Sequence, residues 1–314
     1  MGEKIATRDA YGNALLKLGE LNPNVVVLDA DLSKSTKTAG FSKKYPERFF
    51  QMGIAEADLI ATAAGFATAG KIPFASTFAI FATGRAYDQV RNSIGYPGLN
   101  VKIAATHAGI TVGEDGGSHQ SIEDLGLMRG IPGMTVLNPA DAIETEKLIL
   151  AAVAHNGPVY IRLGREPVPN LFDADYQPEI GKAVRLREGK AATIIATGIM
   201  VEKALAAAET LNQKGITVRV LNIHTIKPID AAEIIKAAWE TGAIVTAEEH
   251  SVIGGLSSAV AEVVVQNHPV PMEFVGVKDR FGQSGKPAEL LEEYGLTAAK
   301  IVEAVEKVIA RKNS

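Results

Sequence analysis

The chain alternates between short apolar runs and longer segments in which apolar residues recur at helical spacing. This alternation is typical of α/β proteins, in which helices cover both faces of mostly parallel sheets. It predicts strands over residues 25–28, 71–78, 101–106, 134–137 and 158–163, and later over residues 193–197, 217–221, 243–247 and 273–277. Helices are predicted over residues 8–18, 201–212, 231–239, 256–266 and 297–311.

One further apolar run, residues 49–54, predicts a buried strand that leads into a helix of small and apolar residues over 56–69. Glu56 lies in the first turn of this helix, where the helix dipole favours a negative charge. Apolar surroundings would instead raise the pKa of its carboxyl group. A carboxyl group that holds a proton at neutral pH is suited to acid–base chemistry. The simpler alternative is that Glu56 lies at a helix N-terminus and has no chemical role.

The length of 314 residues and a hydrophobic fraction of 46% favour two domains with separate cores. Prolines recur among polar residues between 158 and 178, as expected for an interdomain connection. The pattern therefore predicts two three-layer α/β domains, residues 1–170 and 181–314, joined by a linker over residues 171–180.

The balance of charges and the absence of cysteine narrow the class of protein. The net charge of −4 provides no broad positive field for nucleic acid or anionic lipid. With no cysteine, disulfides, thiolate metal sites and a cysteine nucleophile are excluded. The N-terminal Met1 to Lys4 lacks the apolar core of a signal peptide, and no apolar run is long enough to span a membrane. We therefore expect a soluble cytoplasmic protein.

Polar and aromatic residues gather where the predicted strands of the first domain end. In open parallel sheets, ligands bind beyond the carboxyl ends of the strands. Residues scattered by chance would fall at both ends, so this clustering predicts a site. Its members are Asp31, Ser35, Glu56, Phe78, His107 and Arg165.

A glycine-rich loop over residues 107–120 contains His107, His119 and the acidic pair Glu114 and Asp115. The two histidines are too far apart for a simple metal chelate, so we expect no metal site formed by this chain. Hydrogen bonding to a polyhydroxylated ligand fits the loop better. A solvated loop explains one histidine easily, but less easily two beside Asp115.

Aromatic and basic residues give weaker signals when each is considered alone. Phe78 and Phe81 could stack on a flat ring, although two phenylalanines at this spacing are more often core. Arg8, Arg85 and Arg165 could each be surface charges. Only convergence at one place would make two of these arginines a clamp for a phosphate group.

In the second domain, an acidic strand end, Glu248 to His250, precedes the glycine pair Gly254 and Gly255 at the start of a helix. Such a helix start can bind an anion. We expect instead that the glycines allow close packing of the helix on its sheet, and we assign these residues no chemistry.

The motifs together resemble the C-terminal half of transketolases, which are thiamine diphosphate enzymes. Residues 53–56, Gly-Ile-Ala-Glu, are similar to the Gly-Ile-x-Glu motif of this family, and residues 112–120 resemble its donor-sugar loop. The resemblance covers essentially the whole chain. It implies a pyrimidine-binding domain followed by a transketolase C-terminal domain.

The resemblance implies a set of cofactor contacts. Glu56 would be catalytic, because the glutamate of the motif hydrogen-bonds N1′ of the aminopyrimidine and promotes removal of the thiazolium C2 proton. Phe78 and Phe81 would flank the pyrimidine ring, and Asp31 would lie near the cofactor.

The resemblance also implies a sugar phosphate as substrate. His119 and Asp115 would hydrogen-bond the first hydroxyl groups of the sugar, and His107 and His119 would join Glu56 as catalytic residues. The phosphate group would be held by Arg8, Ser35, His107 and Arg165.

Two departures from the family pattern are visible. Gly84 replaces a tyrosine found in many transketolases, and the run Arg85 to Gln89 also resembles deoxyxylulose-phosphate synthases. The Gly-Asp-Gly motif with a later asparagine, which holds the diphosphate and Mg²⁺, is absent from this sequence. We therefore expect an N-terminal-type partner subunit to supply that site within an α2β2 assembly.

The predicted function is that of one subunit of a split transketolase, which transfers a two-carbon ketol unit from a ketose phosphate to an aldose phosphate. Two alternatives use the same cofactor: half of a deoxyxylulose-phosphate synthase, and the β subunit of a 2-oxoacid dehydrogenase. The second of these should lack the pattern of His107 and residues 114–120. A non-catalytic regulatory subunit with the same fold is an alternative of another class.

Overall fold

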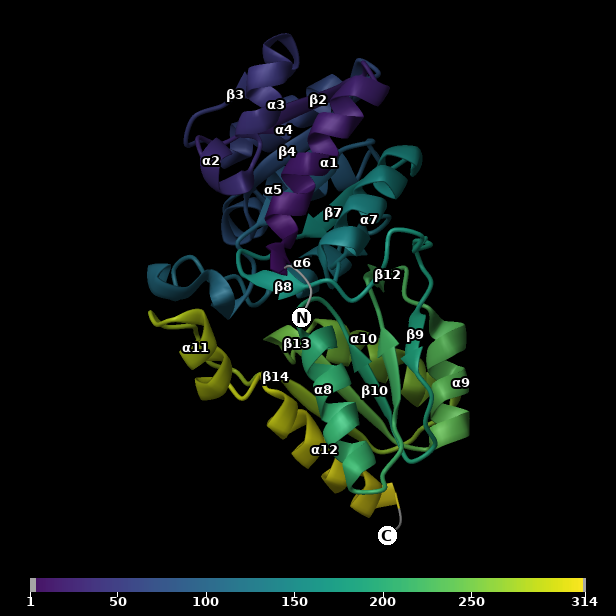
Figure 1. The fold of residues 1–314 in the computed structure, drawn as a ribbon. Helices are drawn as coiled ribbons and strands as arrows, with labels where there is room; N and C mark the ends of the chain where they lie inside the picture. Colours follow the sequence, from purple (N-terminus) through teal and green to yellow (C-terminus); the bar gives the residue numbers. More distant parts are fainter. Residues whose placement is uncertain (1–3, 313–314) are drawn as a thin grey trace.

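The computed structural model describes residues 4–312, so the expectation about a signal peptide falls mainly on residues outside the described range. Two α/β units are stacked on one another, the first coloured purple to teal and the second green to yellow (Figure 1). The predicted fold class is therefore confirmed. Within residues 4–312, no helix has the length and apolar character needed to cross a membrane.

The first unit is built on a seven-stranded sheet in the order β12-β6-β7-β5-β4-β2-β3, parallel except for the antiparallel strand β12. The strands are β2 (Val25–Asp29), β3 (Phe49–Gln51), β4 (Ile72–Phe78), β5 (Lys102–Thr106), β6 (Thr135–Leu137), β7 (Val159–Arg162) and β12 (Thr225–Lys227). Both faces are covered because successive side chains of a strand point to opposite sides. In β2, Val25 and Val27 belong to the hydrophobic cluster on one face, whereas Val26 and Leu28 belong to the cluster on the other.

The helices of the first unit include α1 (Thr7–Leu21), α2 (Ser33–Thr36), α3 (Ala39–Lys44), α4 (Glu56–Thr68), α5 (Tyr87–Gln89), α6 (Asp124–Arg129) and α7 (Ala142–Ala154). Short 3-10 segments η1 (Pro46–Arg48) and η4 (Ile110–Asp115) and π-helical segments η2 (Phe81–Arg85) and η3 (Val90–Gly95) complete it. Strand β1 (Lys4–Ala6) pairs with β8 (Pro167–Pro169), which ties the start of the unit to its end.

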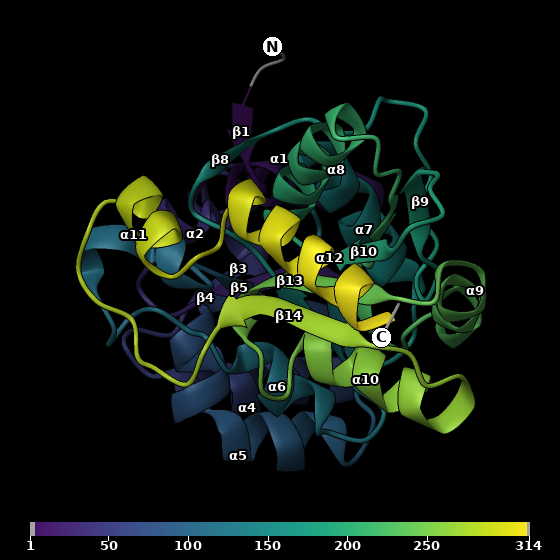
Figure 2. The same ribbon diagram turned by 90° about the horizontal axis from the view of Figure 1, so that it is seen from below.

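The second unit contains a five-stranded sheet in the order β14-β13-β10-β11-β9, parallel except for β9. Its strands are β9 (Val184–Arg187), β10 (Thr193–Ala196), β11 (Arg219–Asn222), β13 (Ile244–Ser251) and β14 (Met272–Val277). Its helices are α8 (Met200–Gln213), α9 (Ala231–Thr241), α10 (Leu256–Asn267), α11 (Pro287–Glu293) and α12 (Ala298–Lys312). Helices α8 and α12 cover one face of this sheet, and α9 and α10 cover the other (Figure 2).

The prediction of two separate cores is wrong. One hydrophobic cluster runs from Leu28 and Leu59 in the first unit to Ile223 and Val260 in the second. In addition, β12 belongs to the second half of the sequence but pairs with β6 in the sheet of the first unit. The two units therefore share buried apolar surface, which favours a fixed arrangement between them.

The buried strand predicted over residues 49–54 is also wrong in its extent and burial. Strand β3 covers only Phe49–Gln51, lies at the edge of the sheet and is partly exposed. The next residue, Met52, still donates from its backbone to the carbonyl of Asp29 at 2.9 Å. Gly53 then adopts a φ of 69°, a conformation that suits glycine, and the side chain of Ile54 is 78% exposed.

Candidate active site

The carboxyl ends of β2, β4, β5 and β7 meet at one edge of the seven-stranded sheet, because these strands are parallel neighbours. Phe78 ends β4, and His107 and Arg165 follow β5 and β7 closely. This edge is the site predicted from the sequence. Its side chains form a basic group, a stack of aromatic rings and a separate acidic residue.

The basic group is centred on Arg8 and His107. Nη1 of Arg8 donates to the backbone carbonyl of Ser35 at 3.3 Å and to Nε2 of His107 at 3.0 Å. Since a guanidinium only donates, Nε2 must accept, and the proton of the neutral ring lies on Nδ1, 2.9 Å from Oγ1 of Thr106. The structure therefore brings together three of the four residues predicted to hold a phosphate group.

Arg165 approaches the same group from the end of β7. Its Nη1 donates to the carbonyl of Val112 and lies 3.6 Å from a carboxylate oxygen of Glu114 and 3.9 Å from one of Asp115. Burial lowers the pKa of Arg8, and the positive charge of Arg165 adds to this effect. The backbone N–H of Arg8 donates to the carbonyl of Gly164 at 3.4 Å, so the two arginines start from neighbouring points of the backbone.

His107 is only 3% exposed and adopts a φ of 58°, a left-handed conformation in which histidine is enriched among non-glycine residues. Burial lowers its pKa to about 3, and the charges of Arg8 and Arg165 contribute in the same direction. The ring is consequently neutral at physiological pH. It serves as an acceptor that holds the guanidinium of Arg8.

A stack of rings continues from His107. The centroid of Phe78 lies 3.8 Å from that of His107 and 5.8 Å from that of Phe81, with nearly parallel planes. The ring centroid of His119 lies 6.4 Å from that of Phe78 and 5.4 Å from that of Phe81, and its plane is steeply inclined to both rings. The two phenylalanines and the two histidines thus form one cluster of rings, in which Phe78 and His107 are buried and Phe81 and His119 are partly exposed.

Glu56 opens α4, as predicted, and is 4% exposed. Its environment is not purely apolar, because Nη1 of Arg85 lies 3.0 Å from Oε1 of Glu56. The guanidinium of Arg85 also lies 4.2 Å from the centroid of Phe81 and links the carboxylate to the ring stack. Sequence reasoning named Arg85 but did not connect it with Glu56.

Arg85 reaches Glu56 from the π-helical segment η2, which also contains Gly84. Single π-helical turns frequently occur at functional sites. Gly84 is exposed, and a Cβ at this position would meet nothing within 4 Å. The packing of the segment therefore does not require glycine at this position.

Among the predicted site residues, Asp31 is not linked to the others by the hydrogen bonds, ion pairs and ring contacts described above. It is exposed, has a φ of 62°, and its backbone N–H donates to Oε1 of Gln51 at 2.7 Å. The neighbouring Asp29 was missed. Its buried carboxylate accepts from the backbone N–H of Leu32 and from the hydroxyl groups of Thr36 and Thr38, and so holds the segment that carries Ser35.

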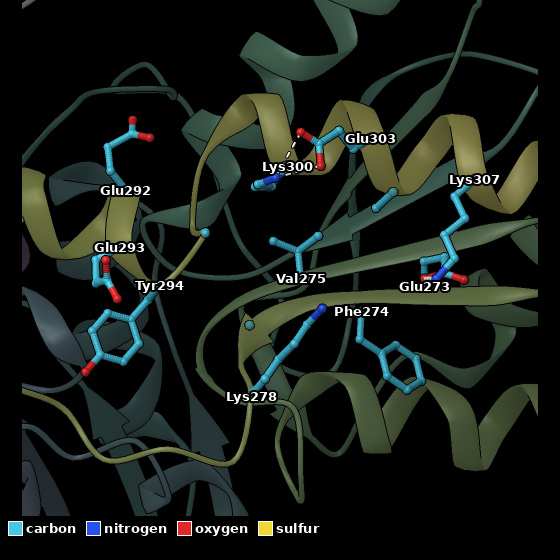
Figure 3. A pocket seen from close by; sticks show the side chains of 13 residues that line it. Glu273, Phe274, Val275, Lys278, Glu292, Glu293, Tyr294, Lys300, Glu303 and Lys307 are labelled. Atoms are coloured by element: carbon cyan, nitrogen blue, oxygen red, sulfur yellow. Dashed lines mark hydrogen bonds and ion pairs between the residues drawn. The ribbon is translucent and has the colours of Figure 1, made fainter.

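A well-defined cavity lies elsewhere. It has a volume of about 420 Å³ and is lined by β14, α11 and α12 of the second unit (Figure 3). Its lysines and glutamates largely pair with one another, as Lys300 does with Glu303 and Lys307 with Glu273, both at 2.8 Å. None of the predicted site residues lines it.

Comparison with known proteins assigns the site to a class. Residues 3–170 match the family description "Transketolase, pyrimidine binding domain", and residues 181–301 match "Transketolase, C-terminal domain". The chain belongs to the transketolase family and corresponds to the C-terminal half of that enzyme, whose activity is ketol transfer.

Among its relatives, the 6-deoxy-6-sulfo-D-fructose transketolase subunit SqwH of Clostridium sp. (strain MSTE9) is 48% identical, over 98% of this chain and 95% of that protein. Transketolase of Homo sapiens is 38% identical, over 99% of this chain but only 50% of that protein. A solved structure described as "Split gene transketolase, inactive beta4 tetramer" has a TM-score of 0.92 and 58% identity, covering 98% of this chain and 99% of that chain.

Membership of this family implies thiamine diphosphate as cofactor. The ring surface of Phe78 and Phe81 beside the buried carboxylate of Glu56 fits the pyrimidine part of that molecule. For the magnesium-bound part, residues 4–312 contain no group of three histidine, aspartate or glutamate side chains that could hold a metal ion.

Proposed function

We propose that this chain is the C-terminal subunit of a split transketolase that transfers a two-carbon ketol unit from a ketose phosphate to an aldose phosphate. The observation that carries the proposal is an unbroken line of contacts at the strand-end edge. It runs from Glu56 through Arg85, Phe81, Phe78 and His107 to Arg8. A carboxyl group, a ring surface and an anion-binding group are what a pyrimidine and a sugar phosphate require.

Glu56 is proposed to hydrogen-bond N1′ of the pyrimidine, and Phe78 and Phe81 to support the ring. When bound, thiamine diphosphate supplies the carbon nucleophile that takes up the ketol unit. In the chain alone, Oε1 of Glu56 is paired with Arg85, whose side chain is 55% exposed. An exposed guanidinium moves at little cost, so it can leave Glu56 when another hydrogen-bonding group arrives.

Arg8 and Arg165 are proposed to bind the phosphate group, with Ser35 beside them. His107 then acts by orienting Arg8, because its Nε2 accepts from that guanidinium. Asp115, whose side chain is 46% exposed, and the partly exposed His119 remain accessible for the sugar hydroxyl groups. Asp31, which the contacts leave at a distance from this group, is proposed to lie near the cofactor in the complete enzyme.

The Mg²⁺ ion and the diphosphate are proposed to be held mainly by an N-terminal-type partner subunit, in an α2β2 assembly in the cytoplasm. The relative described as an inactive β4 tetramer supports self-association of the chain without a partner.

The domain boundaries proposed from the sequence, residues 1–170 and 181–314 with a linker between them, agree with the pairing of β8 at residues 167–169. Limited proteolysis tests them, since the first cuts should fall within residues 171–180. First cuts inside either unit would contradict these boundaries.

The anion carried by the sugar has a specific alternative. The relative from Clostridium is named for a sugar that carries a sulfonate instead of a phosphate. Two guanidinium groups can bind either oxyanion, but the second negative charge of a phosphate gains more from them. We therefore expect the phosphate donor to be favoured over its sulfonate analogue. A preference for the sulfonate donor would instead identify this chain with that relative's substrate.

The test is to mix the chain with an N-terminal-type transketolase subunit, thiamine diphosphate and Mg²⁺, and to supply a ketose phosphate and an aldose phosphate. A new ketose phosphate supports ketol transfer. Condensation of pyruvate with an aldose phosphate would indicate a deoxyxylulose-phosphate synthase, and oxidation of a 2-oxoacid would indicate a dehydrogenase. If the mixture has no activity and this chain only alters the activity of another enzyme, the regulatory alternative is correct.

A further inference from the structure

The loop that carries Asp115 and His119 is held from outside by the second unit. Glu249 on β13 is 3% exposed, and its Oε1 accepts from the backbone N–H of Thr111 at 2.7 Å. This approach needs a glycine in the loop, because a Cβ at Gly109 would lie 2.3 Å from the Glu249 carboxylate. The start of the loop is therefore fitted to a residue 138 positions away in the chain.

Gln120, at the end of the loop, makes the central contact. It is 2% exposed, and its Nε2 donates to the carbonyls of Ile110 and Gly113, both at 3.1 Å, and to that of Gln283 at 2.9 Å. A side-chain amide has two N–H groups, so one of them is shared. Three carbonyls around one nitrogen fix the orientation of the amide and join the loop to the segment before α11.

The segment 282–284 follows the outer side of the loop. Oγ of Ser284 donates to the carbonyl of Glu114 at 2.7 Å, directly before Asp115 in the chain. Close packing extends along this line: a Cβ at Gly117 would lie 2.6 Å from the carbonyl oxygen of Gly282. Asp115 and His119 thus extend from a loop whose backbone is held at both ends.

We propose that the second unit positions the sugar-binding residues Asp115 and His119 through a clamp formed by Glu249, Ser284 and the amide of Gln120, and that Gln120 is a positioning residue. Gln120 is buried, and its amide nitrogen donates only to backbone carbonyls, as expected for a residue that acts by holding the loop. This inference rests on the proposed function in one respect, the binding of sugar hydroxyl groups by Asp115 and His119.

The experiment compares Gln120→Leu, Ser284→Ala and the control Arg129→Met. Arg129 also bridges the two units, donating to the carbonyl of Gly254 at 2.8 Å and to Glu262 at 2.7 Å, but it does not touch the loop. Hydrogen–deuterium exchange of the isolated chain over residues 110–120 should become about tenfold faster in Gln120→Leu, because the carbonyls of Ile110, Gly113 and Gln283 lose their donor. Ser284→Ala should show a smaller increase, and Arg129→Met none.

In the mixed enzyme, kcat/KM for a ketose phosphate should fall by about 10- to 100-fold in Gln120→Leu, as expected for a displaced binding group. Hydroxypyruvate keeps the hydroxymethyl group beside the ketone but lacks the later hydroxyl groups of the sugar, so for this donor the fall should be smaller, about threefold. Arg129→Met should keep the wild-type ratio between the two donors. Equal losses for both donors would overturn the positioning role.

The two measurements separate the clamp from the function. Unchanged exchange over residues 110–120 in both Gln120→Leu and Ser284→Ala would overturn the clamp whatever the enzyme does. If Gln120→Leu fails to fold, the clamp is tested with Ser284→Ala alone, by its exchange rate over residues 110–120 and by its ratio of kcat/KM between the two donors. A wild-type mixture that transfers no ketol unit, while the loop still loosens in the variants, would refute the proposed function and leave the clamp standing.

Discussion

The carboxyl ends of the strands in the two sheets bear similar residue types and use them differently. At the seven-stranded sheet, the buried carboxylate of Glu56 pairs with a guanidinium that is 55% exposed, and Arg165 is 32% exposed. At the five-stranded sheet, β13 carries Glu248, Glu249 and His250, none of them more than 3% exposed. The first edge is open to ligands, whereas the second is closed by its own chain.

Glu248 shows how the second edge is closed. Its carboxylate accepts from the backbone N–H groups of Leu256 and Ser257, both at 2.7 Å, and so occupies the N-terminus of α10. A Cβ at Gly255 would lie 2.1 Å from this carboxylate, which confirms that glycine is needed here for close packing. The helix start does bind an anion, but the anion belongs to the protein. A carboxylate at the end of a strand is therefore a candidate catalytic group only where its hydrogen-bonding partners can be displaced by a ligand.

The largest effect expected is on turnover at the open edge. Glu56→Gln should keep the fold and slow turnover by roughly two to four orders of magnitude, the usual contribution of acid–base assistance. Exchange of the thiazolium C2 proton, followed by NMR in the assembled enzyme, should slow in parallel. The matched control is Asp58→Asn on the exposed side of the same helix turn, which should change neither rate. An unchanged exchange rate in Glu56→Gln would remove Glu56 from its assigned role.

The opposite result is expected at the closed edge. Glu248→Leu leaves two buried N–H groups without acceptors, and should lower the free energy of unfolding by about 3 kcal/mol, since each bond to a charged group contributes about 1.5–3 kcal/mol. Chemical denaturation measures this loss. Variants that remain folded should retain the turnover per assembled site. A selective loss of turnover with unchanged stability would mean that the second edge takes part in the chemistry.

The basic group at the open edge should act on phosphorylated substrates alone. Replacing Arg8 or Arg165 by methionine should cost about 1.5–3 kcal/mol, the range for hydrogen bonds to charged groups. Steady-state kinetics should place the loss mostly in KM for phosphorylated donors, and hardly at all in KM for hydroxypyruvate. Similar losses with both donors would contradict a phosphate clamp and indicate a structural role for the two arginines.

A pH dependence of stability due to His107 is also expected. Its pKa is lowered to about 3 in the folded chain, against about 6.5 in the unfolded chain. Between these values only the unfolded chain binds the proton, so the free energy of unfolding falls as the pH drops below 6.5. In His107→Gln this contribution is absent, and Tm should decline less steeply between pH 6.5 and 4. Because His224 shifts in the same direction, the difference between variant and wild type is the quantity to compare. Parallel Tm profiles would show that His107 is not buried as a neutral ring.

Patterns along the sequence were sufficient to predict much of the fold and part of the candidate site. Periodicity identified β2, β4, β5 and α4 and placed Phe78 and His107 at strand ends, because these features depend on neighbours along the chain. The same reasoning missed the shared core, the pairing of β12 with β6, and the contact of Glu249 with Thr111. These depend on residues far apart in sequence, for which a single chain carries no local signal. The pairing of Glu56 with Arg85 was missed for the same reason, since the two residues lie on different elements, 29 positions apart.

The central claim, that this chain completes its active site only with a partner, is tested most directly by one assay of ketol transfer. The chain alone, the N-terminal-type subunit alone and their mixture are each supplied with thiamine diphosphate, Mg²⁺, a ketose phosphate and an aldose phosphate. We expect no product from either subunit alone, because this sequence lacks the Gly-Asp-Gly motif with a later asparagine to which the family resemblance assigns the diphosphate and Mg²⁺. Product should appear on mixing and reach its maximum at equal amounts of the two subunits. Ketol transfer by this chain alone, at the rate of the mixture, would contradict the account.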